Sequence, residues 1–484
     1  MSHDEPFAVL HETHSALVLL CGDRAYKMKK PVVTDFLDFG TRERRERACA
    51  RELELNRRLA PDVYLGVGEL TDPAGGPGEP VLCMRRMPDA ARLSKTLADP
   101  GAIGHILPDL VHLLTRFHDG ADRGPGIDRD ATVEALRERW SSLLSGLSEP
   151  PITADLVGRL HDRVHRYLDG RKPLFDKRIA TGRIVDGHGD LRAGDIFVLP
   201  DGFRVLDCLD FDDELRHVDR LDDIAFLAMD LEFRGHPELA GTLVDDYLAG
   251  TDDPAPESLR HHYIAYRATV RAKVDCIRHQ QGDAEAAEHA TRHVDLALRH
   301  LDAGAVRLAL VGGLPGTGKS TVAQRLAHET GAILLSSDHI RSIRRAQGVL
   351  TGPSGAYGAG AYRPGARAQV YSVLRAEART LLEAGRSVVL DASWTDAGER
   401  RRAARLAADT GADLIELQCT APESVTAERI AARSGGESEA TPAIATAMAA
   451  DRAPWPEADI LDTTEPLPDT VRTAVRAWRR GMPL

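Results

Sequence analysis

VRLALVGGLPGTGKST, residues 306–321, decides the fold of the second half of the chain. The apolar run 306–311 is typical of a buried strand, and 313–320 fit the spacing GxxxxGK[ST] in full. A helix is expected over 319–330, directly after the loop. Strand, glycine loop and helix in this order predict a phosphate-binding loop, because the glycines let backbone amides turn inward around phosphate oxygens.

Lys319 and Ser320 carry the chemistry expected of this loop. Lys319 places a positive charge on the β- and γ-phosphates, and Ser320 offers its hydroxyl to Mg²⁺. Asp391 ends an apolar strand expected over 387–391, where a carboxylate binds Mg²⁺ directly or through water. The predicted nucleotide-binding residues are Gly313, Leu314, Pro315, Gly316, Thr317, Gly318, Lys319, Ser320 and Thr321.

Asp338 and Arg341 follow the next expected strand, 332–336, in the motif SSDHIR. An acid at the end of this strand can accept the proton of a substrate hydroxyl, and an arginine one turn later can hold substrate or a phosphate oxygen. Arg429 and Arg433 lie four residues apart on an expected helix, where they are predicted to neutralise charge on the transferring phosphate.

Strands and helices alternate along 304–484, which predicts a parallel sheet covered by helices on both faces. The loop GLPGTGKST and the motif SSDHIR resemble those of the small-molecule P-loop kinases, a group that includes gluconate kinase, chloramphenicol phosphotransferase and the kinase half of polynucleotide kinase. The resemblance implies ATP-dependent phosphorylation of a hydroxyl group with Asp338 as the base. No motif identifies the acceptor.

A second pattern of the same chemistry lies at 188–195, HGDLRAGD. The protein-kinase catalytic loop has the spacing H-x-D, with a metal-binding residue five positions after the Asp. Asp190 is therefore the predicted base and Asp195 the predicted metal ligand. Asp207, in VLDCLDF, takes the position of the second metal-binding acid.

Lys27, in the expected strand DRAYKMKK, is the predicted phosphate-binding lysine, and Glu52 on the following helix is its predicted ion-pair partner. Lys29 points to the same side of the strand, so spacing alone leaves the choice between the two lysines open. Residues 82–87 take the position of the hinge between the two lobes.

The first 300 residues resemble the aminoglycoside phosphotransferase and choline-kinase-like family, which shares the protein-kinase fold. HGDLRAGDI is similar to that family's HGDLHxxNI, and DDIAF at 222–226 to a later acidic motif, in which Asp223 is expected to order the catalytic loop. The whole chain resembles the bacterial bifunctional aminoglycoside phosphotransferase/ATP-binding proteins. The resemblance implies an α+β bilobal kinase-like domain, with lobes 1–87 and 88–303, followed by an α/β P-loop domain over 304–484.

Three features depart from the family pattern. Asp195 stands where the family has Asn, Arg192 stands where it has His, and no GxGxxG loop precedes Lys27. A carboxylate at 195 can still bind Mg²⁺, but it adds negative charge next to Asp190 and Asp207. A working site with altered metal preference and a weakened site both remain open.

The composition excludes several other classes of protein. Of 484 residues, 62 are Lys or Arg and 74 are Asp or Glu, a net charge of −12, which argues against a nucleic-acid coat or a membrane-surface protein. Six cysteines without a CxxC pair indicate neither a zinc knuckle nor a redox site. The acidic start and short apolar runs predict a cytoplasmic protein.

The predicted function is tandem transfer of the γ-phosphate of Mg-ATP to a hydroxyl of a small molecule, which can be a sugar, aminocyclitol, aminoglycoside or nucleoside. A hydroxylated metabolite is favoured over an antibiotic. Two alternatives remain. One is a nucleotide-gated regulatory protein with a degenerate first domain. The other is a 5′-hydroxyl nucleic-acid kinase in the second domain, suggested by Arg341, Arg344 and Arg345 beside Asp338.

Overall fold

The computed structural model describes residues 6–13, 15–33, 38–71, 73–97, 100–147, 150–349, 363–432 and 441–480. The chain divides into two compact units. Unit 1 comprises Met1–Ile152, Lys177–Ala255 and Tyr263–Ala297, and unit 2 comprises Thr153–Asp176, Pro256–His262 and Leu298–Leu484. The domain boundaries predicted from the sequence stay a prediction.

Unit 1 begins with a five-stranded antiparallel sheet in the order β1-β2-β3-β5-β4. Its elements are β1 (Ala8–Glu12), β2 (Ala16–Cys21), β3 (Arg24–Lys29), α1 (Arg42–Asn56), β4 (Tyr64–Leu70) and β5 (Glu79–Arg85). Helix α1 begins after Thr41, whose hydroxyl accepts a hydrogen bond from the amide of Arg44, and it packs against β4 and β5. Buried Val63, Leu82 and Met84 form part of the core of this lobe.

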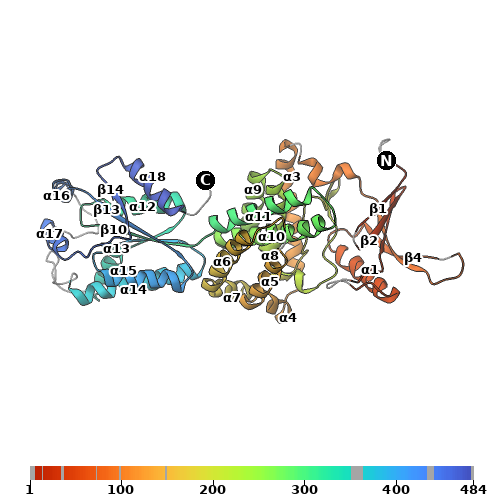
Figure 1. Cartoon of the computed structure of the whole chain (residues 1–484), viewed down its shortest axis with the longest axis horizontal. Helices are drawn as coiled ribbons and strands as arrows, with labels where there is room; N and C mark the ends of the chain where they lie inside the picture. Colours follow the sequence, from red (N-terminus) through yellow and green to blue (C-terminus); the bar gives the residue numbers. More distant parts are fainter. Residues whose placement is uncertain are drawn as a thin grey trace. The chain divides into compact units, whose positions relative to one another are not determined.

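Between Asp89 and Ala303 the chain is mainly helical (Figure 1). The helices are η1 (Asp89–Ala91), α2 (Leu93–Thr96), α3 (Pro100–Gly120), α4 (Pro125–Asp128), η2 (Arg129–Ala131), α5 (Val133–Ser145), α6 (Ala154–Gly170), α7 (Lys172–Ala180), η3 (Glu214–Arg216), α8 (Arg220–Phe233), α9 (Pro237–Gly250), α10 (Glu257–Gln280) and α11 (Ala286–Ala303).

Two short antiparallel pairs interrupt the helices and frame the predicted catalytic loop. β6 (Ile184–Asp186) pairs with β9 (His217–Asp219), and β7 (Ile196–Leu199) pairs with β8 (Gly202–Val205). The loop 187–195 connects β6 to β7, and Asp207 follows β8. An antiparallel sheet followed by a largely helical lobe confirms the kinase-like fold expected for this part of the chain.

Unit 2 contains a five-stranded parallel sheet in the order β11-β12-β10-β13-β14. The strands are β10 (Arg307–Gly312), β11 (Ile333–Ser336), β12 (Val388–Asp391), β13 (Asp413–Thr420) and β14 (Asp459–Asp462). The helices are α12 (Lys319–Thr330), α13 (Ser337–Ala346), α14 (Pro364–Glu383), α15 (Ala397–Asp409), α16 (Glu423–Ala431), α17 (Pro442–Ala450) and α18 (Leu467–Trp478).

Helices α12 and α18 cover one face of the parallel sheet, and α14 and α15 cover the other (Figure 1). Because both faces are covered, β10 is buried along its whole length. This arrangement confirms the predicted α/β P-loop fold.

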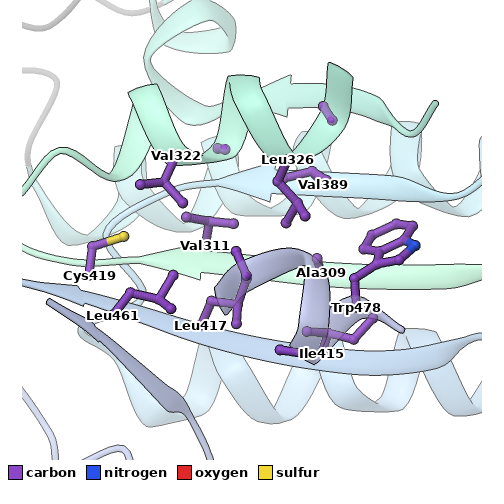
Figure 2. Packing of buried hydrophobic residues seen from close by; sticks show 14 residues of the cluster. Ala309, Val311, Val322, Leu326, Val389, Ile415, Leu417, Cys419, Leu461 and Trp478 are labelled. Atoms are coloured by element: carbon purple, nitrogen blue, oxygen red, sulfur yellow. The ribbon is translucent and has the colours of Figure 1, made fainter. Parts of the chain in front are cut away.

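The core beneath α12 and α18 is a continuous apolar cluster (Figure 2). Val311, Leu417 and Leu461 come from three strands, and Leu326 and Trp478 come from the two helices. This packing fixes where the carboxyl ends of β10 and β12 lie, and therefore where the phosphate loop begins. Among the helices of the described residues, none has the length and apolar composition that a membrane span requires.

Leu461 and Ile460 provide a matched test of this core, because they are neighbours on β14 but only 1% of Leu461 is exposed, against 57% of Ile460. Leu461→Ala should lower the free energy of unfolding of unit 2 by about 2–5 kcal/mol, because it leaves a cavity. Ile460→Ala should cost less than about 1 kcal/mol. Three of the four tryptophans, at 394, 455 and 478, lie in unit 2, so denaturant unfolding followed by tryptophan fluorescence measures the difference. Equal losses would contradict the assigned core.

Candidate functional site

The predicted catalytic loop of unit 1 is held by Asp223, which is completely buried at the start of α8. Its carboxylate accepts hydrogen bonds from the amides of His188, at 2.7 Å, and Gly189, at 2.9 Å. The ring of His118 lies 3.1 Å from the same carboxylate. These contacts place Asp190 at the end of a fixed turn, as expected for a residue that orders the loop.

Arg267 on α10 supports the same turn, a role that the sequence analysis missed. Its guanidinium donates to both carboxylate oxygens of Asp222, at 2.7 and 2.9 Å, and to the carbonyl oxygen of Gly189 at 2.9 Å. Arg267 lies 78 residues from Gly189 in the sequence, so no local spacing signals this contact.

Arg192 joins the predicted base to the predicted metal ligand. Its guanidinium lies 3.0 Å from a carboxylate oxygen of Asp190 and 2.9 Å from one of Asp195. Burial, together with the charges of Asp207 and Asp190, raises the pKa of Asp195 to about 7 against the attraction of Arg192. The additional carboxylate at 195 is thus paired with the additional arginine at 192.

Lys27, Glu52 and Asp207 meet although the sequence separates them widely. The ammonium group of Lys27 lies 2.7 Å from one oxygen of Glu52 and 3.2 Å from a carboxylate oxygen of Asp207. Burial alone would lower the pKa of Lys27, but Asp207 and Glu52 raise it well above its usual value, so the ammonium stays charged.

Lys29 occupies a different environment on the same strand. Its ammonium group lies 2.7 Å from the other oxygen of Glu52 and 2.6 Å from Asp210, and only 5% of its side chain is exposed, against 20% for Lys27. Lys27 therefore faces the predicted metal ligand, whereas Lys29 lies in an internal ion pair. This contrast favours Lys27 as the phosphate-binding lysine.

The backbone at Asp207 adopts a left-handed conformation, with φ of 60°. Such a conformation is costly for a residue other than glycine and persists only where the surroundings impose it. The amide of Asp207 donates to the hydroxyl of Tyr64 at 3.3 Å, and the amide of Cys208 donates to the side chain of Asn56 at 2.9 Å. Asn56 and Tyr64 are further residues that the sequence analysis did not identify.

In unit 2 the loop 313–318 turns from β10 into α12. Gly316 and Gly318 have φ of 83° and 80°, which other residues rarely adopt, and Gly318 directly precedes the first helical residue, Lys319. The hydroxyl of Thr317 donates to the carbonyl oxygen of Leu314 at 2.7 Å and tightens the loop. Backbone amides at a helix start are favourable anion ligands.

Asp391 lies at the end of β12, between β10 and β11, and pairs in register with Val311 and Ser336. One of its oxygens accepts a hydrogen bond from the hydroxyl of Ser336 at 3.4 Å. The other is buried and, among the described residues, has no hydrogen-bond partner. Burial raises the pKa of the Asp391 carboxyl, and the charge of Lys319 and the nearby hydroxyl of Ser320 oppose this. Asp391 therefore has an unused ligand oxygen close to the phosphate loop.

Asp338 lies on the first turn of α13, and Arg341, three residues later, forms an ion pair with it. The amide of Asp338 donates to the hydroxyl of Ser336 at 3.3 Å, and the same hydroxyl donates to Asp391. Ser336 thus connects the predicted base to the predicted metal ligand.

Arg429 on α16 contacts the phosphate loop through Thr463. Its guanidinium donates to the hydroxyl of Thr463 at 3.2 Å and to the carbonyl oxygen of the same residue at 2.8 Å, and that hydroxyl donates to the carbonyl oxygen of Thr317 at 2.7 Å. A cavity of about 390 Å³ adjoins this contact, lined by Gly316, Gly318, Thr321, Val322, Arg429, Thr463, Glu465, Leu467 and Thr470. Arg433 lies outside the described residues.

Residues 32–262 match the phosphotransferase enzyme family, and residues 308–454 match the AAA domain. Two curated relatives, "Uncharacterized protein Mb2027c" of Mycobacterium bovis and "Uncharacterized protein Rv2004c" of Mycobacterium tuberculosis, are each 47% identical over 482 residues. The alignment covers 99% of this chain and 97% of theirs.

Several solved structures are similar at low identity. The GDP and kanamycin complex of APH(2")-IIia is 13% identical, with 61% of this chain and 94% of that chain covered and a TM-score of 0.40. A choline/ethanolamine kinase family protein from Mesorhizobium loti is 15% identical, with the same coverage and a TM-score of 0.36. A sugar kinase from Janibacter sp. is 20% identical, with 37% and 96% covered and a TM-score of 0.30.

Substitution of each lysine by methionine separates their roles. Lys29→Met should lower the free energy of unfolding of unit 1 by roughly 3–5 kcal/mol, because it leaves Asp210 and one oxygen of Glu52 buried without their cation. Lys27→Met should instead weaken Mg-ATP binding at unit 1 at least about tenfold. Chemical unfolding followed by circular dichroism and nucleotide titration in a Lys319→Ala background measure the two effects. Loss of nucleotide binding in Lys29→Met alone would reverse the assignment.

Proposed function

The chain belongs to the same family as its mycobacterial relatives, and we propose that each of its two domains transfers the γ-phosphate of ATP to a hydroxyl of a small molecule. The two domains are a phosphotransferase enzyme domain followed by an AAA domain. Both domains belong to kinase and phosphotransferase families, so the chain is an enzyme of that class. In this proposal the first transfer takes place in residues 1–303 and the second in residues 304–484, the boundary predicted from the sequence.

The observation that carries the proposal for unit 1 is the convergence of Lys27, Glu52 and Asp207. Glu52 lies 25 residues from Lys27 in the sequence and Asp207 lies 180 residues from it, yet both carboxylates contact its ammonium group. A charged lysine oriented by an acid and set beside a metal-binding acid is the arrangement that protein kinases use to hold ATP phosphates. Asp190 is then the proposed base, on a loop that Asp223 orients.

In unit 2 the proposed parts are the phosphate loop, Asp391 and Asp338. Lys319 and the loop amides would hold the phosphates, while Asp338 would accept the proton of the acceptor hydroxyl and Arg341 would orient it. One buried oxygen of Asp391 has no hydrogen-bond partner among the residues that the structure describes, which supports a nearby cation, since such an atom is costly without a ligand.

Mg²⁺ is the proposed cofactor, held by Ser320 and Asp391 in unit 2 and by Asp195 and Asp207 in unit 1. Nucleotide-bound Mg²⁺ takes one or two carboxylates and completes its shell with phosphate oxygens and water, which fits both ligand sets. When bound it neutralises negative charge on the phosphates.

One observation favours a second candidate function for unit 1. Because Arg192 pairs with both Asp190 and Asp195, the predicted base and metal ligand are already engaged by a cation. A unit that binds a ligand without turning it over, and regulates the second domain, would accommodate such a contact.

Asp190→Asn and Lys319→Ala, made separately in the full chain, distinguish these functions. Each substitution should lower Mg-ATP-dependent ADP release with the acceptor of its own domain by about 10²–10⁴-fold and leave the other domain active, because each removes a base or a phosphate ligand from one site alone. The measurement is coupled ADP release over a panel of sugars, aminocyclitols, aminoglycosides and nucleosides.

Asp246→Asn, on the exposed side of α9, is the matched control and should leave both activities unchanged. If Asp190→Asn leaves every turnover intact, unit 1 does not use Asp190 as a base. That result would support the second candidate function, in which unit 1 binds a ligand and regulates the second domain. If neither substitution matters, the phosphotransfer proposal is wrong for both units.

A further inference from the structure

Arg271 lies next to the predicted catalytic loop of unit 1 but has no role in the site described so far. It follows Arg267 by four residues on α10, so the two side chains leave the same face of the helix. Arg267 donates to the carbonyl oxygen of Gly189, the residue directly before Asp190. This face of α10 therefore presents Arg271 alongside the loop that carries Asp190.

Among the described residues, Arg271 makes no hydrogen bond or ion pair, although it is partly buried. The acids within reach are already engaged. Asp275, one turn further on, pairs with His293 at 2.9 Å and Arg278 at 3.3 Å. Asp230 accepts hydrogen bonds from the amide of Ala193 and from Arg234. Within the part of the chain that the structure describes, Arg271 therefore forms no ion pair of its own.

Burial and the repulsion of Arg192 both lower the pKa of Arg271, and the attraction of Asp190 opposes them. Arg271 therefore interacts with the two charged groups at the centre of the predicted site. Two guanidinium groups in a partly buried place repel each other, and an anion bound near both would relieve this cost.

Arg192 also has an unused donor. One terminal nitrogen of its guanidinium contacts Asp190 and Asp195, but its Nε is buried and has no hydrogen-bond partner among the described residues. A buried donor left unpaired costs free energy, so its retention needs an explanation. A ligand oxygen would satisfy it.

We propose that the hydroxyl acceptor of unit 1 carries an oxyanion, a carboxylate or a phosphate, that Arg271 binds beside Asp190, with the Nε of Arg192 as a further donor. Guanidinium groups suit this ligand because their planar array of donors matches the oxygens of carboxylate and phosphate. The inference rests on the proposed function of unit 1 and narrows its acceptors. An unpaired cation at this place disfavours the polycationic aminoglycosides, which need an acidic lining.

Four sugars that differ mainly in charge test the proposal: glucose, glucosamine, glucuronate and glucose 6-phosphate. ADP release is measured with the full chain carrying Lys319→Ala, so that only unit 1 turns over. We expect the highest kcat/KM with glucuronate or glucose 6-phosphate. Comparison of these two sugars shows whether the site prefers a carboxylate or a phosphate. Arg271→Ala should lower that kcat/KM about 30-fold or more, mainly through KM, and Arg271→Lys should restore part of it.

Arg116→Ala is the matched control, since it removes an exposed arginine from helix α3 of the same unit and should leave the preference unchanged. A preference for glucose or glucosamine that Asp190→Asn abolishes and Arg271→Ala leaves intact would overturn the oxyanion inference while phosphotransfer stands.

A binding measurement decides the case in which none of the four sugars turns over. Arginine modification by phenylglyoxal is followed at Arg271 by mass spectrometry with each sugar present. Protection by glucuronate or glucose 6-phosphate, but not by glucose, supports the anion site even if transfer is absent. Equal modification with all four overturns the inference. Titration of the full chain carrying Lys319→Ala with Mg-ATP reports separately whether the proposed function of unit 1 has failed.

Discussion

One buried carboxylate, that of Asp223, holds the loop on which the first site depends. Burial alone would raise the pKa of Asp223, yet the hydrogen bonds from His118 and from the His188 amide hold it well below its usual range. The negative charge is therefore permanent, and the loop amides have a fixed acceptor. Because Asp190 follows these amides directly, its position is set by the protein interior rather than by a bound ligand.

The second unit positions its acid by strand register instead. Asp391 lies on the strand between the one that leads into the phosphate loop and the one that leads to Asp338. Packing of the apolar cluster beneath α12 and α18 keeps that register, since a one-residue shift would move the side chains of a strand to the opposite face. In unit 1 the predicted metal ligand Asp207 pairs with Lys27 and the predicted base Asp190 with Arg192, whereas one oxygen of Asp391 has no partner among the described residues.

Sequence spacing predicted the features that short stretches of chain encode. The phosphate loop at 313–320, the strands around it and the H-x-D turn each depend on neighbouring residues, and the structure has these elements. Contacts between distant segments were not predictable. The choice between Lys27 and Lys29 depends on which acidic side chains contact each lysine. Thr463 contacts the phosphate loop at Thr317, although 146 residues separate the two in the sequence. The grouping of 153–176 with unit 2 likewise arises from tertiary contacts, such as Arg163 with Asp413.

The two departures from the family motif, at 192 and 195, prove to be one ion pair. Relative to the motif's Asn and neutral His, Asp195 adds one negative charge and Arg192 adds one positive charge, and the two groups lie 2.9 Å apart. Arg192 therefore supplies a counter-ion for the carboxylate that stands in place of the motif's Asn. A lone carboxylate beside Asp190 and Asp207 would weaken the site by repulsion, but a carboxylate introduced together with its counter-ion avoids that cost. The pairing thus answers the charge-repulsion argument for a weakened site, while the contact between Arg192 and Asp190 is the argument for a unit that binds without turnover.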